Sequence, residues 1–376
     1  MDATTNALAI RDALSVLKRY TGRPLSPGAE LVELATHGSG SLTLRRWNGT
    51  EASASLAADG PLTVGTVHVP ADALANAIGK AKGTVRLTAA DGTLTVTTDG
   101  GTGTVRIGDA QDFPAPDRND YVPLATITAT ECSRVATVAK AAANGIDARA
   151  VLTSVAISAN GDGSGEAVAT DTYRMHVARI ATVSGSPEDV TIIPADVMRI
   201  ATKGATDGAY VSVTAEGKRF AVAYTSTKGP KRAPRVVHYR VTGATYEGPY
   251  PNYRTLLPDP DAISARWTVG DAKGTADAIG AFANKVNFPA IMEPAGSAVR
   301  VTASFADGTE LEAVAPMRPD ADAIGEDASI AFNPAYFRDA LTHAGDGATV
   351  ALREASKAAL IEGDGSYALL MPMRVR

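Results

Sequence analysis

The chain has 376 residues, of which 45 % are hydrophobic, 20 % charged and only 5 % aromatic. This length predicts two or three domains, and the apolar content excludes a globally disordered chain. The formal net charge of −5 argues against a simple nucleic-acid-binding protein, which is usually basic.

Cys132 is the only cysteine, so the chain cannot form an internal disulfide or a cysteine-based metal site. Residues 1–6 lack the basic and apolar regions of a secretion signal. No apolar run approaches the ~18 residues that a membrane span needs. We therefore expect a cytoplasmic protein that does not enter a membrane.

One pattern of predicted elements recurs along the chain: a helix, strands, a proline that opens a second helix, and further strands. The prolines are Pro70, Pro194 and Pro334, and proline is well placed at the first helical position because it has no N–H to leave unpaired. In chain order, the expected helices cover 8–20, 71–82, 131–143, 195–203, 275–286 and 335–343. Alternating apolar residues predict strands at 67–69, 85–88, 94–96, 191–193, 211–213, 220–222, 330–332 and 349–352.

Two helices with many strands in each repeat predict an α+β fold, in which helices pack on one face of an antiparallel sheet. Proline-bearing connectors at 122–124 and 256–258 mark the expected boundaries. The sequence thus predicts three repeated domains, at 1–124, 125–256 and 257–376.

Charge is distributed unevenly between these helices and the rest of the chain. Windows around the helices (10–23, 71–86, 131–149, 196–203, 271–285 and 335–343) hold 15 Lys or Arg and 8 Asp or Glu. Their net charge is therefore +7, and the remainder of the chain carries −12. This pattern suits a basic surface that contacts phosphates, but ordinary solvated helix faces would produce it too.

A second basic cluster lies at 228–240 and contains Lys228, Lys231, Arg232, Arg235 and Arg240. We interpret it as a solvated hairpin loop, with an additional phosphate contact as the alternative.

The sequence lacks the motifs of common active sites. The five histidines are scattered, and neither HExxH, GxxxxGK[ST] nor GxSxG occurs. We therefore expect a protein that is not an enzyme and that uses no metal or cofactor.

Three segments resemble the bacterial DNA polymerase III beta subunit, the sliding clamp. They are 168–175 (VATDTYRM), 250–258 (YPNYRTLLP) and 371–375 (MPMRV), similar to the family's ATDGHRL, FPDYRRVLP and MPMRL. They occur in the family's order and at close to its spacing across the whole chain, in agreement with the threefold repeat.

The resemblance implies a head-to-tail homodimer that closes into a ring, with helices around the hole. Such a clamp would enclose double-stranded DNA without sequence preference and act as a replication processivity factor. It would tether a DNA polymerase, a clamp loader and repair proteins through short linear peptides. Thr172 and Tyr173 depart from the family's Gly-His. A clamp that serves repair or a mobile element therefore remains as an alternative. A structural β-repeat protein is the alternative from another class, which would explain the repeats and the low aromatic content.

The resemblance also implies three sets of site residues. The peptide pocket would contain Leu152, Thr170, Thr172, Tyr173, Arg174, Met175, Pro251, Thr255, Leu256, Phe288, Asn333, Tyr336, Ser356, Leu369, Leu370, Met371, Pro372, Met373 and Arg374. By the resemblance, DNA contacts would come first from Arg23 and Arg149, and the basic helix windows add Lys18, Arg19, Lys80, Lys82, Arg134, Lys140, Arg199 and Lys203 as candidates. The ring contact would involve Val105, Ile107 and Phe282.

Overall fold

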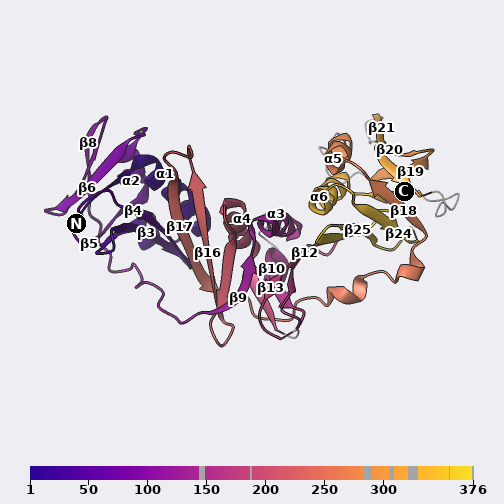
Figure 1. The fold of residues 1–376 in the computed structure, drawn as a ribbon, viewed down its shortest axis with the longest axis horizontal. Coiled ribbons are helices and arrows are strands. Elements are labelled where there is room, and N and C mark those ends of the chain that lie inside the picture. Colours follow the sequence, from indigo (N-terminus) through magenta and orange to yellow (C-terminus); the bar gives the residue numbers. More distant parts are fainter. Residues whose placement is uncertain are drawn as a thin grey trace. The chain divides into compact units, whose positions relative to one another are not determined.

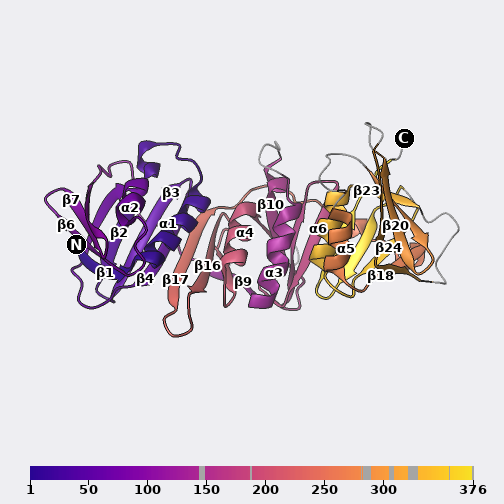
Figure 2. The ribbon, with the colours of Figure 1, turned by 90° about the horizontal axis from the view of Figure 1, so that it is seen from above.

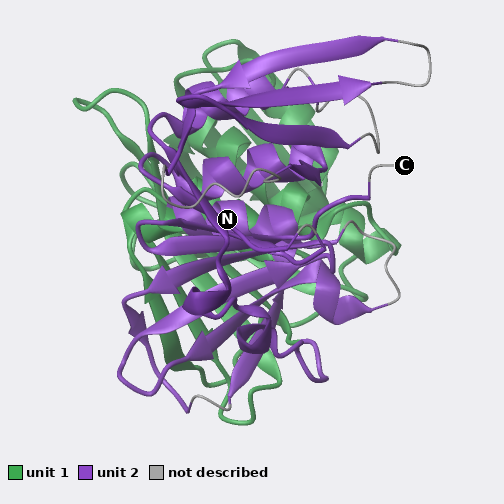
Figure 3. Ribbon diagram, turned by 90° about the vertical axis from the view of Figure 1, so that its right-hand side faces the viewer, with its two compact units in different colours: residues 1–132, 196–245 green, residues 133–195, 246–376 purple. Residues whose placement is uncertain are grey.

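The computed structural model describes residues 1–143, 149–186, 189–280, 282, 289–304, 309–320, 329–354 and 356–374 (Figure 1). The chain forms two compact units, shown in Figure 3. Unit 1 contains Met1–Cys132 and Asp196–Thr245, and unit 2 contains Ser133–Ala195 and Tyr246–Arg376. The division passes through helix α3 (Ala129–Val138) and just inside helix α4 (Ala195–Gly204).

Unit 1 is built on two antiparallel sheets. The smaller sheet has the order β1 (Asp2–Asn6), β6 (Thr84–Ala90), β7 (Thr93–Thr98), β8 (Gly101–Arg106). The larger sheet runs through β9 (Val122–Ile127), β15 (Ala209–Val213), β16 (Arg219–Lys228), β17 (Arg235–Ala244), β4 (Thr50–Ala57), β3 (Ser41–Asn48), β2 (Leu31–His37) and β5 (Gly65–Pro70). The pairing of β17 with β4 joins segments that are far apart in the sequence, with Val237 opposite Leu56.

Helix α1 (Ala7–Thr21) packs along β3, β4 and β17 of the larger sheet (Figure 2). Ile10, Leu14 and Leu17 follow helical spacing and are buried, so they form the stripe that faces the sheet. Asn6 begins the helix, because its side-chain oxygen accepts a hydrogen bond from the Ala9 N–H at 3.1 Å. Helix α2 (Ala71–Ile78) packs against β5, β7 and β8.

Unit 2 also contains two antiparallel sheets. The larger has the order β14 (Val190–Pro194), β10 (Ser154–Ala159), β11 (Gly165–Thr170), β12 (Arg174–Ile180), β26 (Ser366–Leu370), β25 (Ala359–Gly363), β24 (Thr349–Leu352), β18 (Ala265–Val269), β22 (Met317–Pro319). The smaller has the order β21 (Glu310–Ala315), β20 (Ala298–Ser304), β19 (Ala290–Ala295), β23 (Ile330–Phe332). β13 (Thr182–Val183) is a two-residue strand.

The main core of unit 2 surrounds Trp267, Phe332 and Phe337, which are fully buried. Helices α5 (Ala272–Gly280) and α6 (Pro334–Ala344) pack together, and α6 also covers β25 and β26. Short 3₁₀ helices are η1 (Pro27–Glu30), η2 (Ala139–Ala141), η3 (Ala150–Thr153), η4 (Tyr253–Leu256) and η5 (Pro260–Ala262).

The predicted α+β class and the helix that follows each repeat proline are confirmed, since α2, α4 and α6 begin at 71, 195 and 334. The earlier helix of each repeat also forms, as α1, α3 and α5. The three-domain division at 124 and 256 stays a prediction. No helix within the described ranges is long and apolar enough to span a membrane.

Candidate functional site

A pocket of about 420 Å³ opens on the surface of unit 2. Its walls come from the β11–β12 turn, from η4 and the residue after it, from the β24–β25 loop, and from β26 and the residue after it. The lining residues are Thr170, Thr172, Tyr173, Arg174, Met175, Thr255, Leu256, Leu257, Arg353, Ser356, Lys357, Ala358, Leu369 and Met371.

The β11–β12 turn is held in a strained conformation by its own side chains. Thr172 has a φ of 79°, in the left-handed region that glycine adopts without cost but a β-branched residue does not. The Thr170 hydroxyl accepts a hydrogen bond from the Thr172 N–H at 3.1 Å. One oxygen of Asp171 accepts from the N–H groups of Tyr173 and Arg174, both at 3.0 Å. These bonds fix the direction in which the Tyr173 side chain leaves the turn.

Arg174 has partners for each of its guanidinium nitrogens. They donate to Asp171 at 3.0 Å, to Asp339 of α6 at 3.0 Å, and to the Lys140 carbonyl at 2.8 Å. The guanidinium also lies over the Tyr336 ring, 4.2 Å from its centroid. Arg174 therefore links the turn to α6 and η2. The carboxylates of Asp171 and Asp339 neutralise its charge.

The opposite wall is anchored by a buried polar cluster beneath η4. Glu166 accepts hydrogen bonds from Tyr253 at 2.6 Å, Arg254 at 3.0 Å and Tyr367 at 3.3 Å. Burial raises the pKa of the Tyr253 hydroxyl, so it remains a proton donor to this carboxylate. The cluster sets the position of Leu256, which lies two residues after Arg254 in the same 3₁₀ helix.

Large apolar side chains are exposed around this pocket. Tyr173 is 65 % exposed, Leu256 56 %, Met371 43 % and Leu257 37 %. The Met371 N–H donates to the Tyr173 carbonyl at 2.9 Å, which draws the C-terminal segment to the rim. Apolar side chains gathered at a concave surface are typical of a docking site for an apolar ligand.

Ten of the predicted pocket residues line this pocket: Thr170, Thr172, Tyr173, Arg174, Met175, Thr255, Leu256, Ser356, Leu369 and Met371. Leu152 and Leu370 are instead buried in the core, and Tyr336 lies under Arg174. Asn333 caps α6, because its side-chain oxygen accepts from the N–H groups of residues 335 and 336. Pro251, Pro372, Met373 and Arg374 do not line it, and Phe288 lies outside the described residues.

Four lining residues, Leu257, Arg353, Lys357 and Ala358, were not predicted. Leu257 follows Leu256 directly, so the YRTLLP motif contains the signal that could have found it. The other three belong to a loop whose approach to the motif at 168–175 depends on the pairing of β12, β26 and β25.

The predicted DNA-contacting residues are nearly all on the surface. Arg19, Arg23, Lys80, Lys82, Lys140, Arg149 and Lys203 are exposed. Three others form ion pairs with carboxylates: Lys18 with Asp72 at 3.2 Å, Arg199 with Asp196 at 2.7 Å, and Arg134 with Asp364 at 3.2 Å. Their roles in DNA contact stay predictions.

The basic cluster at 228–240 spans the hairpin loop at 229–234 and the strands beside it, because Lys228 ends β16, and Arg235 and Arg240 lie in β17. Two of its cations pair with Asp12 of α1, Lys228 at 3.3 Å and Arg235 at 3.6 Å. Lys231 and Arg232 are exposed at the tip. The loop is thereby held against the helix that carries Lys18 and Arg19.

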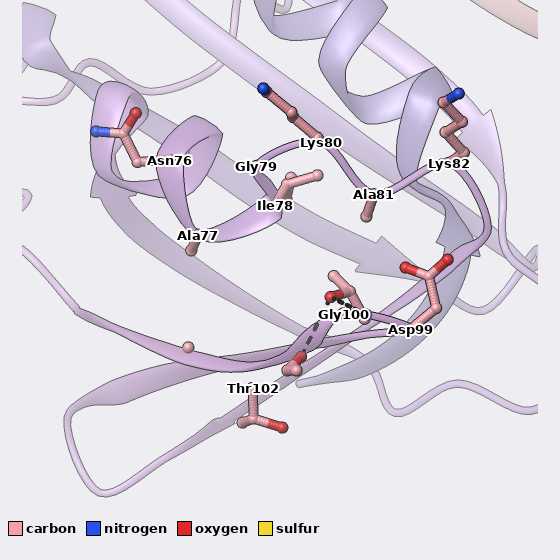
Figure 4. A pocket seen from close by; sticks show the side chains of 13 residues that line it. Asn76, Ala77, Ile78, Gly79, Lys80, Ala81, Lys82, Asp99, Gly100 and Thr102 are labelled. Carbon is pink, nitrogen blue, oxygen red and sulfur yellow. Dashed lines mark hydrogen bonds between the residues drawn. The ribbon is translucent and has the colours of Figure 1, made fainter.

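A groove of about 770 Å³ lies beside β8, the end strand of the smaller sheet in unit 1. Figure 4 shows Lys80 and Lys82 on the segment that leaves α2, across the groove from the β7–β8 hairpin with Asp99. Of the residues predicted for the ring contact, Val105 lies in β8 and is 5 % exposed, and Ile107 follows the strand. Phe282 is buried in the core of unit 2.

Comparison with known proteins agrees with these features. No protein-family model matches the sequence. The beta sliding clamp of Streptomyces coelicolor is 27 % identical over 313 residues, which cover 74 % of this chain and 76 % of that protein. The crystal structure of the DNA polymerase III subunit beta from Pseudomonas aeruginosa superposes with a TM-score of 0.81 at 20 % identity, and 100 % of each chain is covered.

The C. crescentus beta sliding clamp gives a TM-score of 0.80 at 18 % identity, covering 100 % of this chain and 99 % of that one. These matches confirm the resemblance that the three sequence motifs predict, and the sliding-clamp fold extends over the whole chain.

Proposed function

We propose that this chain, which has the fold of the bacterial DNA polymerase III beta subunits, is a sliding clamp that encircles duplex DNA and tethers a polymerase to it. The full-length match to sliding-clamp structures is the observation that carries this proposal. The chain would act without catalysis, in the cytoplasm, as three repeated domains at 1–124, 125–256 and 257–376.

Closure into a ring would use the free edges of two sheets. β8 ends the smaller sheet of unit 1, and β21 ends the smaller sheet of unit 2. An end strand presents unpaired backbone groups that can pair with another chain. Arg106 on β8 and Glu310 and Glu312 on β21 are exposed and of opposite charge. A head-to-tail contact between β8 of one copy and β21 of the next is heterologous, and two such contacts close a dimer.

DNA would be held by enclosure, with weak contacts to phosphates. Exposed cations such as Arg19 and Arg23 support such contacts, because lysine and arginine bind the phosphate backbone without reading sequence. Contacts of this kind are sensitive to salt and permit sliding. The net charge of −5 is compatible with this, since only the surface around the hole has to attract DNA.

Partners would dock in the pocket of unit 2 through short linear peptides. Leu256, Met371 and Tyr173 offer an adaptable apolar surface for a Leu or Phe side chain. Polymerase, clamp loader and repair proteins would compete for this pocket. We expect a chain that ends at Leu370 to lose peptide binding while keeping its assembly, because β8 and β21 lie elsewhere in the two units.

The test is retention on DNA after loading by a matching clamp loader. The clamp should stay on a nicked circular plasmid through a gel-filtration column and leave the plasmid after it is cut once. Blocking both ends of the cut DNA with bound protein should restore retention. Equal loss from circular and cut DNA would refute topological binding.

A further inference from the structure

In unit 1, β16 and β17 form a hairpin that extends past the strands on either side of it. β15 pairs with β16 only over residues 220–224, and β4 pairs with β17 only over residues 237–242. The ladder between β16 and β17 continues to Lys228, which lies opposite Arg235. Residues 226–236, the basic hairpin, therefore project beyond the neighbouring strands of the larger sheet.

The tip of the basic hairpin is a β-turn that displays two cations. The Ala233 N–H donates to the Pro230 carbonyl at 3.0 Å and closes the turn. Lys231 and Arg232 occupy its two central positions, and both are exposed. Within the described part of the chain, neither has a carboxylate partner. Proline on each side of the turn, at 230 and 234, restricts the backbone, so the two cations stand in solvent on a stiff support.

The base of the basic hairpin is fastened to α1 by one carboxylate. Lys228 and Arg235 face each other across the two strands, where like charges repel. Asp12 of α1 pairs with both, at 3.3 Å and 3.6 Å. Gly229, with a φ of 95°, leaves room for this contact, because a Cβ there would come within 2.8 Å of the Arg235 guanidinium. Four cations of the hairpin thus share a single carboxylate.

The composition of the loop favours phosphates over a protein partner. Residues 229–234 contain neither Asp nor Glu, and their only apolar side chains are those of Ala and Pro. Protein interfaces depend on large aromatic or apolar anchors, which this loop lacks. Phosphates of a nucleic-acid backbone need only cations, and a projecting ribbon can present them without reading sequence.

The basic hairpin also adjoins other exposed cations of unit 1. Arg19 lies seven residues after Asp12 on α1, which places the two residues on the same face of the helix, two turns apart. Arg19 is exposed and is one of the predicted DNA contacts. The hairpin therefore continues the cationic surface of α1 past Asp12.

Resting on the proposed function, we propose that the basic hairpin is an additional phosphate-binding site for duplex DNA. Lys231 and Arg232 contact the backbone phosphates. Asp12 limits the strength of the site, because it neutralises part of the charge of Lys228 and Arg235 at the base of the hairpin.

The test measures how salt weakens the binding of the full-length chain to a short fluorescent duplex, by anisotropy. The hairpin variant is Lys231→Gln/Arg232→Gln, which replaces two exposed turn residues and leaves the core intact. The matched control is Arg118→Gln/Lys218→Gln, which removes two exposed cations elsewhere in unit 1 and changes the net charge equally.

We expect the slope of log K against log salt, where K is the association constant, to be shallower by about 2 in the hairpin variant. Between about 50 and 200 mM salt, the affinity of the wild type should therefore fall about tenfold more than that of the variant. The control should keep the wild-type slope. Asp12→Asn should bind more tightly and steepen the slope by about 1, because it releases the two cations at the base.

Cross-linking tests contact directly. Cys132 is buried, so a photoreactive azide can be attached to Lys231→Cys alone. On irradiation this variant should cross-link to the duplex. Glu216→Cys, exposed at the other end of β16, should not. No cross-link from Lys231→Cys would overturn the assignment.

The slopes give further outcomes against the inference. Equal slopes in the wild type and the hairpin variant would overturn it, and so would equal reductions in the hairpin variant and the control. If poly-glutamate of matched charge binds as tightly as the duplex and loses as much affinity in the hairpin variant, an acidic protein segment replaces DNA as the ligand.

Retention on a nicked circular plasmid separates this inference from the proposed function. The hairpin variant should be retained as well as the wild type, because enclosure holds the loaded clamp. If the wild type is retained but the hairpin variant keeps the wild-type slope, only the inference fails. If the wild type escapes equally from circular and cut DNA, the proposed clamp function fails, whatever the slopes.

Discussion

The rings of His176 and His343 stack inside unit 2, with centroids 4.7 Å apart and planes inclined by 5°. His343 bridges elements, because its Nδ1 lies 2.7 Å from the Thr137 hydroxyl and its Nε2 lies 2.9 Å from the Val177 carbonyl. The pair therefore ties α6 to β12, the strand that begins with Arg174 at the pocket. Because both rings are buried, water could not hydrate a positive charge on either of them.

We expect this pair to make the stability of unit 2 sensitive to acid. Burial lowers the pKa of His343 from 6.5 to about 4, and burial and the neighbouring His343 lower the pKa of His176 well below 6.5. Arg134, Arg174 and Lys140 add positive charge nearby. The unfolded chain binds protons more readily than the folded chain between pH 6.5 and 4, so stability falls as pH drops through this window. The free energy of unfolding changes by at most about 1.4 kcal/mol per pH unit for each histidine.

The measurement is urea unfolding at pH 7.5 and pH 5, followed by Trp267 fluorescence in a Trp47→Phe background so that the signal comes from unit 2. His176→Asn/His343→Asn should flatten the pH dependence, whereas His37→Asn, at an exposed position, should not. An unchanged slope in the double variant would contradict the role of the pair.

The left-handed conformation of Thr172 predicts a gain in stability when this residue is replaced by glycine. Strained positions of this kind cost about 1–3 kcal/mol, and glycine removes the strain while adding some flexibility to the unfolded chain. We expect Thr172→Gly to raise the free energy of unfolding by about 1 kcal/mol. The control is Thr182→Gly in β13, which should lower it. A loss of stability in Thr172→Gly would show that the turn carries no strain.

The proposed ring contact predicts that a charge reversal on β8 weakens self-association and that a second reversal on β21 restores it. Arg106→Glu would set like charges against Glu312 of the neighbouring copy and should weaken self-association about tenfold or more. Arg106→Glu/Glu312→Arg restores opposite charges and should recover most of the loss. Glu216→Arg, at the β15–β16 turn, is the matched control. Dissociation constants come from analytical ultracentrifugation, and failure of the double variant to recover would argue against pairing of these strands.

If the proposed phosphate contacts form, they should determine how salt weakens DNA binding. Arg19→Ala/Arg23→Ala removes two exposed cations and should reduce the slope of log K against log salt by about 2. Lys18→Ala should change it less, because Asp72 already pairs with Lys18 at 3.2 Å. Binding to a short duplex is followed by fluorescence anisotropy between about 20 and 200 mM salt, which is a tenfold range. Equal slopes in the wild type, the double variant and Lys18→Ala would show that Arg19 and Arg23 do not contact DNA.

Much of the fold follows from local signals in the sequence. Pro70, Pro194 and Pro334 each mark the start of a helix, since proline fixes φ and needs no partner for a missing N–H. The apolar spacing in 8–20 predicts α1 to within one residue at each end. The three family motifs then identify the sliding-clamp fold, which composition and periodicity alone would not do.

The pocket was only partly predictable, because its walls meet through long-range strand pairing. The pairing of Arg174 with Leu370 brings together segments almost 200 residues apart. The same sheet carries the β24–β25 loop to the rim, and no local pattern marks Arg353 or Lys357 as pocket residues. Conversely, the resemblance implies that Asn333 belongs to the pocket, but its side chain caps α6.

Closed self-association is the claim on which enclosure of DNA depends, and the solution mass tests it most directly. Light scattering coupled to gel filtration should give one species at twice 38.6 kDa, with a mass that does not change across the micromolar range. A head-to-tail contact that failed to close would instead give masses that grow with concentration. A stable monomer at micromolar concentration, or such a growing series, would contradict the ring.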